Sequence, residues 1–125
     1  MSGFKKMDAK WKKRWLKALR TPADQGGYIQ GKGALVQENR SHYVLDGLQH
    51  YSAEPVDLFC CLGVLTNLMV EKKCDVGGKA WDSSYMSTKA SNIADLGYRA
   101  RKTVAVMNDN GTSFGEIADW IEVNL

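Results

Sequence analysis

The segment best suited to bind a ligand is a glycine-rich stretch over residues 24–33, Asp-Gln-Gly-Gly-Tyr-Ile-Gln-Gly-Lys-Gly. Four of its ten residues are glycines, so the backbone can approach another group closely and present its amides to an anion. Lys32 lies between Gly31 and Gly33 and adds a positive charge. The spacing matches neither the phosphate loop that ends in Gly-Lys-Ser/Thr nor the dinucleotide fingerprint. The segment therefore predicts either an anion-binding loop or a plain turn.

Cations and aromatic rings accompany this segment. Arg20 precedes it, Tyr28 lies within it, and Trp81 follows in a polar stretch, where the indole either anchors a loop or is exposed for stacking. A phosphorylated small molecule with a base ring requires cations, stacking surfaces and backbone amides. The sequence therefore predicts a site for a nucleotide-derived anion. Its candidate ligand-binding residues are Arg20, Gln30, Gly31, Lys32, Gly33, Tyr28 and Trp81.

A strongly basic segment opens the chain. Residues 1–20 hold eight of the seventeen Lys and Arg and one acid, a charge of +7, whereas the other 105 residues carry 9 − 13 = −4. Hydrophobic residues at helical spacing from Met7 to Leu19 predict an amphipathic helix over residues 8–20, which Pro22 ends. Its cationic face is either a solvated surface or a contact for phosphate or an acidic protein. The candidate partner-binding residues are Lys10, Lys13, Lys17 and Trp11.

The cysteines and histidines give little support for catalysis. Cys60 and Cys61 are adjacent in an apolar run, which raises a thiol pKa and favours buried packing over nucleophilic chemistry. Cys74 is alone, and only His42 and His50 supply imidazole, so the spacing fits no zinc site. The chain also contains none of the common catalytic motifs. We therefore expect no enzyme, no metal and no cofactor.

Length and composition bound the class of protein. A chain of 125 residues, 44% hydrophobic and 25% charged, predicts one globular domain over residues 1–125. No apolar run approaches the roughly 18 residues of a membrane span, so no membrane partner is expected. Three cysteines, an odd number, without a signal-peptide core fit a reducing cytoplasm. Whether the protein forms a homo-oligomer is left open.

Turn and periodicity signals predict the remaining elements. Asp46-Gly47 suits a two-residue turn, and the β-forming residues on either side of it predict a hairpin over residues 42–51. In that hairpin His42 and His50 would lie near each other, either as an acid–base pair or simply at the surface. The apolar run over residues 58–70 predicts the core helix. Three further helices are expected over residues 88–96, 98–108 and 114–123. The predicted fold class is α+β, a mostly helical single domain with a small antiparallel β-hairpin packed on the helical core.

Charge argues against sequence-specific reading of DNA. The last two helices have the order of a helix–turn–helix, in which the final helix would enter the major groove. That helix carries Glu116, Asp119 and Glu122 and no Lys or Arg from Glu116 onward, so it would repel phosphates. Only nonspecific nucleic-acid binding through the basic segment remains as a hypothesis of this class.

Four motifs, spread over nearly the whole chain, resemble a family of small proteins of tailed bacteriophages and prophages. They are Trp15-Leu-x-Ala-Leu-Arg20, Gln30-Gly-x-Gly-x-Leu35, Phe59-Cys-Cys-Leu-Gly-Val64 and Met107-Asn-Asp-x-Gly-x-Ser-Phe-x-Glu-Ile-Ala-Asp-Trp-Ile-Glu122. The chain differs from the usual family pattern by a longer insert between Leu35 and Phe59, which holds the predicted hairpin. The resemblance implies a phage accessory protein in the host cytoplasm and, by analogy with other small phage proteins, one that counters host immunity.

These observations lead to a main hypothesis and two alternatives. We predict a noncatalytic phage accessory protein that sequesters an anionic, nucleotide-derived small molecule such as a host immune signal. The first alternative is an inhibitor that binds a host defence or regulatory protein through the basic helix. The second is a nonspecific nucleic-acid binder.

Overall fold

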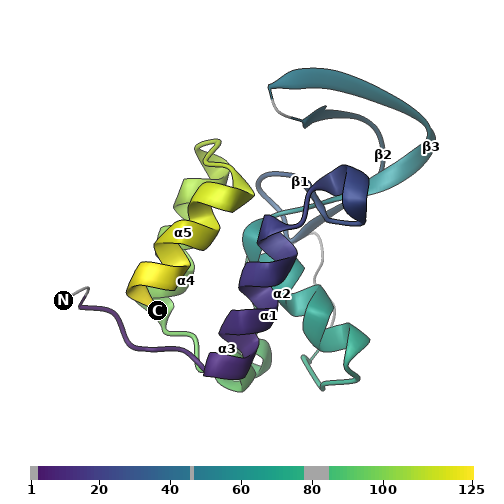
Figure 1. The fold of residues 1–125 in the computed structure, drawn as a ribbon. Coiled ribbons are helices and arrows are strands. Elements are labelled where there is room, and N and C mark those ends of the chain that lie inside the picture. The colour runs from purple at the N-terminus through teal and green to yellow at the C-terminus, as the bar shows by residue number, and fades with distance from the viewer. Residues whose placement is uncertain (1–2, 46, 78–84) are drawn as a thin grey trace.

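The first helix, α1 (Ala9–Arg20), lies in the middle of the helical part of the fold (Figure 1). The computed structural model describes residues 3–45, 47–77 and 85–125. Asp8 caps α1, because its carboxylate accepts a hydrogen bond from the Trp11 amide at 2.9 Å. Trp15 is completely buried, and its indole Nε1 donates to the carbonyl oxygen of Cys61 at 2.9 Å. The apolar face of α1 is thus both packed and hydrogen-bonded.

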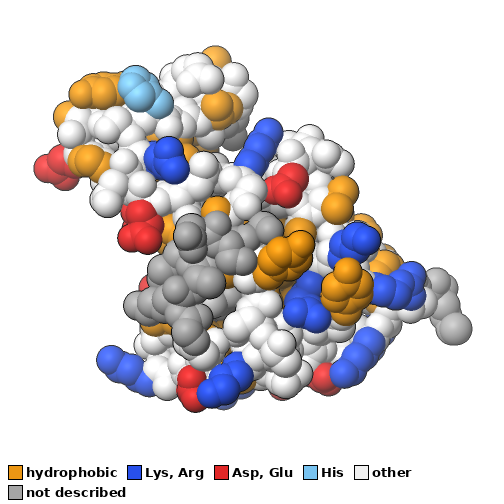
Figure 2. All heavy atoms as spheres, turned by 180° about the vertical axis from the view of Figure 1, so that it is seen from behind, with side chains coloured by type: hydrophobic (Ala, Val, Ile, Leu, Met, Phe, Trp, Pro, Cys, Tyr) orange, Lys and Arg blue, Asp and Glu red, His pale blue; other side chains and the backbone are white. Residues whose placement is uncertain are grey.

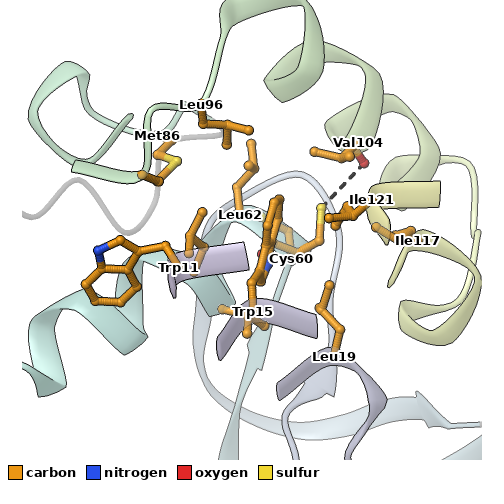
Figure 3. Close-up of a cluster of buried hydrophobic side chains, with 14 of the residues drawn as sticks. Trp11, Trp15, Leu19, Cys60, Leu62, Met86, Leu96, Val104, Ile117 and Ile121 are labelled. Carbon is orange, nitrogen blue, oxygen red and sulfur yellow. Dashed lines mark hydrogen bonds between the residues drawn. The ribbon is translucent and has the colours of Figure 1, made fainter. Parts of the chain in front are cut away.

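Four more α-helices lie within the described residues. They are α2 (Cys61–Glu71), α3 (Thr88–Ala94), α4 (Tyr98–Asp109) and α5 (Phe114–Asn124). Helix α1 packs against α5 and α2, and α4 packs against α2 and α5. Figure 3 shows Trp15 and Leu19 of α1 gathered with Leu62 of α2 and with Ile117 and Ile121 of α5. Side chains from the first and the last helix therefore pack in the same core. No helix within the described residues is long and apolar enough to cross a membrane.

The β-structure is a three-stranded mixed sheet, which corrects the predicted fold class. A short 3-10 helix, η1 (Ala23–Gln25), leads from α1 to strand β1 (Ile29–Gln30), and β2 (Val36–Leu45) and β3 (Leu48–Phe59) follow. The strand order is β1-β3-β2, with β1 parallel to β3 and β2 antiparallel to it. The fold is α+β, but a lone antiparallel hairpin was the wrong description of its sheet. Strand β1 has only two residues, too few to show any alternation in the sequence.

Strand β3 also runs further than predicted, at the expense of the core helix. Residues 58 and 59, expected to be helical, are the last two of β3, and α2 begins at Cys61. Leu58 pairs with Ile29 on one side and with Gln37 on the other, so its backbone is satisfied within the sheet. An apolar run alone does not separate a buried strand from a buried helix.

The two histidines do not form a pair. His42 lies opposite Tyr51, and His50 lies opposite Tyr43, with ring centroids 5.3 and 5.4 Å apart. Because consecutive residues of a strand point to opposite faces, the two imidazoles lie on opposite sides of the hairpin. The acid–base pair considered from the sequence is therefore wrong. Asp46, the first residue of the predicted turn, lies outside the described residues.

The hairpin projects from the helical body as an arm (Figure 1). The chain leaves the body at Leu35 and returns at Cys60, whose amide donates to the Leu35 carbonyl oxygen at 3.1 Å. Between these points, no described residue from 38 to 57 is buried. Figure 2 shows hydrophobic side chains around a histidine on this arm, where Tyr51 is 70% exposed. Residues 38–57 of the insert therefore form an appendage outside the core, whereas Val36 and Leu58 at the two ends of the insert are buried in it.

Candidate functional site

A groove runs between the second half of α1, the turn that follows it, and the second half of α2. We call it the α1–α2 groove. Its volume is about 420 Å³, within the range of roughly 300–1,000 Å³ that holds drug-sized ligands. The residues that line it are Arg14, Lys17, Ala18, Thr21, Gly26, Gly27, Tyr28, Leu68, Glu71 and Lys72.

Three cations line this groove. Arg14 and Lys17 are three residues apart on α1 and so share one face of the helix, and Lys72 is the C-cap residue of α2. None of the three forms an ion pair with another described residue. The guanidinium of Arg14 lies 4.7 Å from the ring centroid of Trp11, which orients it without neutralising its charge. With Glu71 as the only acid among the described lining residues, the groove carries a net positive charge.

Two glycines bring the chain over the edge of the groove. Gly26 has a φ of +88°, a left-handed conformation that glycine adopts without strain. The amide of Gly27 donates to the carbonyl oxygen of Pro22 at 2.9 Å. A Cβ atom at Gly27 would overlap the carbonyl oxygen of Thr21, so only glycine permits this tight return. The turn places Tyr28 beside the cations of α1.

Tyr28 is held in place by hydrogen bonding and by ring packing. Its hydroxyl oxygen accepts a hydrogen bond from Asn67 Nδ2 at 2.8 Å, and its ring centroid lies 4.7 Å from that of Phe59. Asn67 Nδ2 also donates to Glu71 Oε1 at 3.2 Å. Partial burial raises the pKa of Tyr28, the Asn67 hydrogen bond opposes that rise, and the charge of Glu71 adds to it. At neutral pH the phenol is therefore protonated and keeps a hydroxyl proton to donate.

Gln30 and Gly31, predicted to bind the ligand, instead join secondary-structure elements. Gln30 Nε2 donates to Asn108 Oδ1 at 3.0 Å and to the carbonyl oxygen of Thr112 at 2.7 Å. The amide of Gly31 donates to the Phe59 carbonyl oxygen at 2.7 Å, and its own carbonyl accepts from Asn108 Nδ2 at 2.8 Å. The side-chain amide protons of Gln30 and the backbone groups of Gly31 are thus already hydrogen-bonded within the protein.

Lys32 and Gly33 continue the same pattern. The Lys32 amide donates to Gln37 Oε1 at 3.2 Å, and the Gly33 amide donates to Asp109 Oδ1 at 3.0 Å. The amides expected to surround an anion are thus already bound within the chain, although the Lys32 side chain is exposed. Residues 30–33 do not line the α1–α2 groove, and the glycines that do are Gly26 and Gly27, earlier in the same segment.

Arg20 faces the last helix. Its guanidinium lies 2.9 Å from carboxylate oxygens of both Asp119 and Glu122 of α5, and these contacts raise the pKa of Arg20, the Glu122 hydrogen bond most strongly. It lines a second groove of about 400 Å³ along α1 and α5, where its charge is neutralised by these two acids. Of the six predicted ligand-binding residues that the structure describes, Tyr28 alone lines the α1–α2 groove. Trp81 lies outside the described residues.

The predicted partner-binding residues divide into two sets. Lys10, Lys13 and Lys17 are exposed, whereas Trp11 is only 7% exposed and belongs to the core. An indole that faces the core is not available to a partner, so its assignment to an exposed contact was wrong. Lys17 lines the α1–α2 groove, and Lys10 and Lys13 lie outside it.

The cysteines pack as hydrophobic residues, as predicted. Cys61 is completely buried and Cys60 is 6% exposed, and burial raises the pKa of both thiols. Cys60 Sγ accepts from the Gly63 amide at 3.3 Å and so caps α2. All three cysteines are free, and the described part of the chain contains no group of three or more side chains placed to hold a metal ion.

The comparisons with known proteins identify no relative. No protein-family model matches the chain, no curated protein is significantly similar to it, and no solved structure significantly resembles it.

Proposed function

We propose that this protein is a noncatalytic binder of a small, anionic, nucleotide-derived molecule, and that the α1–α2 groove is its binding site. The main support for this proposal is that Arg14, Lys17 and Lys72 lie together around a groove of about 420 Å³. None of these cations forms an ion pair with another described residue. Cations that no carboxylate neutralises attract phosphate strongly, and arginine can hold it through two parallel hydrogen bonds.

The other lining residues suit the organic part of such a molecule. Tyr28 and Leu68 supply aromatic and apolar surface, and the Gly26–Gly27 turn lets a ligand approach the backbone closely. The size of the groove suits a single small molecule rather than an extended polymer. The proposal assigns no chemical step to the groove. Sequestration of a host immune signal, which the resemblance to phage proteins implies, stays a prediction.

Isothermal titration of the full chain tests the proposal. The probes are AMP, cyclic mononucleotides, NAD and ADP-ribose, each added to about 100 μM protein, a concentration at which a binding free energy of roughly −5.5 kcal/mol is still detected. We expect saturable heat from at least one probe, with affinity falling as salt rises because the contact is electrostatic. Absence of heat from every probe would contradict the proposal.

A further inference from the structure

A carboxylate in the α1–α2 groove is at odds with a ligand that is anionic throughout. Glu71 lines the groove beside Lys72, it is exposed, and it forms no ion pair with another described residue. An ionised carboxylate only accepts hydrogen bonds, and it repels a phosphate placed against it. A phosphate in the groove would therefore lie nearer to Arg14 and Lys17 on α1, and Glu71 would suit a neutral hydrogen-bond donor of the ligand.

A hydrogen bond from Asn67 orients the carboxylate of Glu71. Asn67 lies one helical turn before Glu71 on α2, and its Nδ2 donates to Glu71 Oε1 at 3.2 Å and to the Tyr28 hydroxyl at 2.8 Å. Both protons of this amide are thereby used. Glu71 Oε2 makes no hydrogen bond with a described residue, and the Tyr28 proton is likewise free to be donated. Glu71 and Tyr28 thus present an acceptor and a donor that are linked through one side chain.

We infer that the groove selects a ribonucleoside phosphate, with the ribose hydroxyls donating to Glu71 and the phosphate lying at Arg14 and Lys17. This inference rests on the proposed function. Vicinal hydroxyls are a neutral pair of donors that one carboxylate can accept together, and acidic side chains recognise ribose in this way in dinucleotide sites. An anion without hydroxyl groups would form no hydrogen bond with Glu71 and would be repelled by its charge. We therefore assign the choice of ligand to Glu71, Asn67 and Tyr28. The three cations of the groove provide most of the binding affinity.

Titration with three probes tests the inference. AMP carries phosphate and both ribose hydroxyls, 2′,3′-dideoxy-AMP lacks the hydroxyls, and pyrophosphate lacks the nucleoside. We expect the unmodified protein to bind AMP at least tenfold more tightly than dideoxy-AMP. Glu71→Gln should abolish that preference and leave pyrophosphate binding unchanged or stronger, because the substitution removes a negative charge from the groove. Glu38→Gln makes the same change at an exposed site on β2 and serves as the control.

The outcomes separate this inference from the proposed function. Equal affinity for AMP and dideoxy-AMP, or an unchanged preference in Glu71→Gln, would overturn the assignment of Glu71 while an anion-binding groove still stood. Failure of all three probes to bind the unmodified protein would overturn this inference, and absence of heat from the whole nucleotide panel would overturn the proposed function as well. Thermal unfolding of Glu71→Gln checks that the exposed substitution leaves the fold intact.

Discussion

Replacing Arg14 and Lys17 together with alanine is expected to weaken nucleotide binding about a hundredfold. Hydrogen bonds to charged groups contribute about 1.5–3 kcal/mol each, so the loss of two such contacts at the lower end of this range accounts for a change of about a hundredfold. Both side chains line the α1–α2 groove, and neither forms an ion pair that the substitution would break among the described residues. Titration calorimetry with the tightest-binding probe of the panel measures the change.

Lys10 and Lys13 provide a matched control on the same helix. Both are exposed and lie outside the groove, and their joint replacement with alanine removes the same net charge from α1. We expect this control to change affinity less than threefold at about 0.15 M salt, where charges more than about 8 Å apart are screened. Equal losses in the two double variants would mean that the whole basic face attracts the ligand, and would contradict a site in the groove.

Asn108→Ala is expected to destabilise the fold by about 3–5 kcal/mol, because each buried polar group left without a partner costs about 1–3 kcal/mol. Asn108 is completely buried in α4. Its Oδ1 accepts from Gln30 Nε2 and from the Cys61 amide, at 3.0 and 3.1 Å, and its Nδ2 donates to the Gly31 carbonyl oxygen at 2.8 Å. One side chain thus joins the end of β1, the start of α2 and α4.

Denaturant unfolding of Asn108→Ala beside Asn110→Ala measures this effect. Asn110 follows α4 as its C-cap residue, is exposed, and its side chain makes no hydrogen bond with another described residue. Its replacement should therefore lower the free energy of unfolding only slightly. If both variants unfolded at the same denaturant concentration, the three-way junction at Asn108 would not support the fold as described.

The difference between local and long-range information explains which parts of the fold could be predicted. The apolar spacing of α1 is a property of twelve consecutive residues, and the structure begins that helix at Ala9, one residue after the predicted start. Strand β1 forms because Ile29 meets Leu58, a partner 29 residues away that no local pattern reveals. Residues 58 and 59 are likewise a strand because of distant partners in the sheet. An apolar run alone indicates that a segment is buried, and does not tell whether it is a strand or a helix.

The candidate site was only partly predictable for the same reason. The glycine composition drew attention to the glycine-rich segment, but Gln30, Gly31 and Gly33 are hydrogen-bonded to Asn108 and Asp109, more than seventy residues further along the chain. Arg20 is neutralised by α5 in a contact of similarly long range. Glu71 and Lys72 belong to the groove only because α2 lies against α1, and a Lys or Glu at the end of a helix carries no such signal by itself.

The measurement that tests the central claim most directly is the mapping of AMP on the ¹⁵N-labelled protein by amide chemical shifts. A ligand in the α1–α2 groove should move the amides of Lys17, Gly26, Gly27, Tyr28 and Glu71 in a saturable manner. The amides of Lys32 and Gly33, which are hydrogen-bonded within the chain, and those of the projecting hairpin should move little. Saturable shifts confined to residues 30–33, to the hairpin or to the outer face of α1, with the groove amides unmoved, would contradict the account.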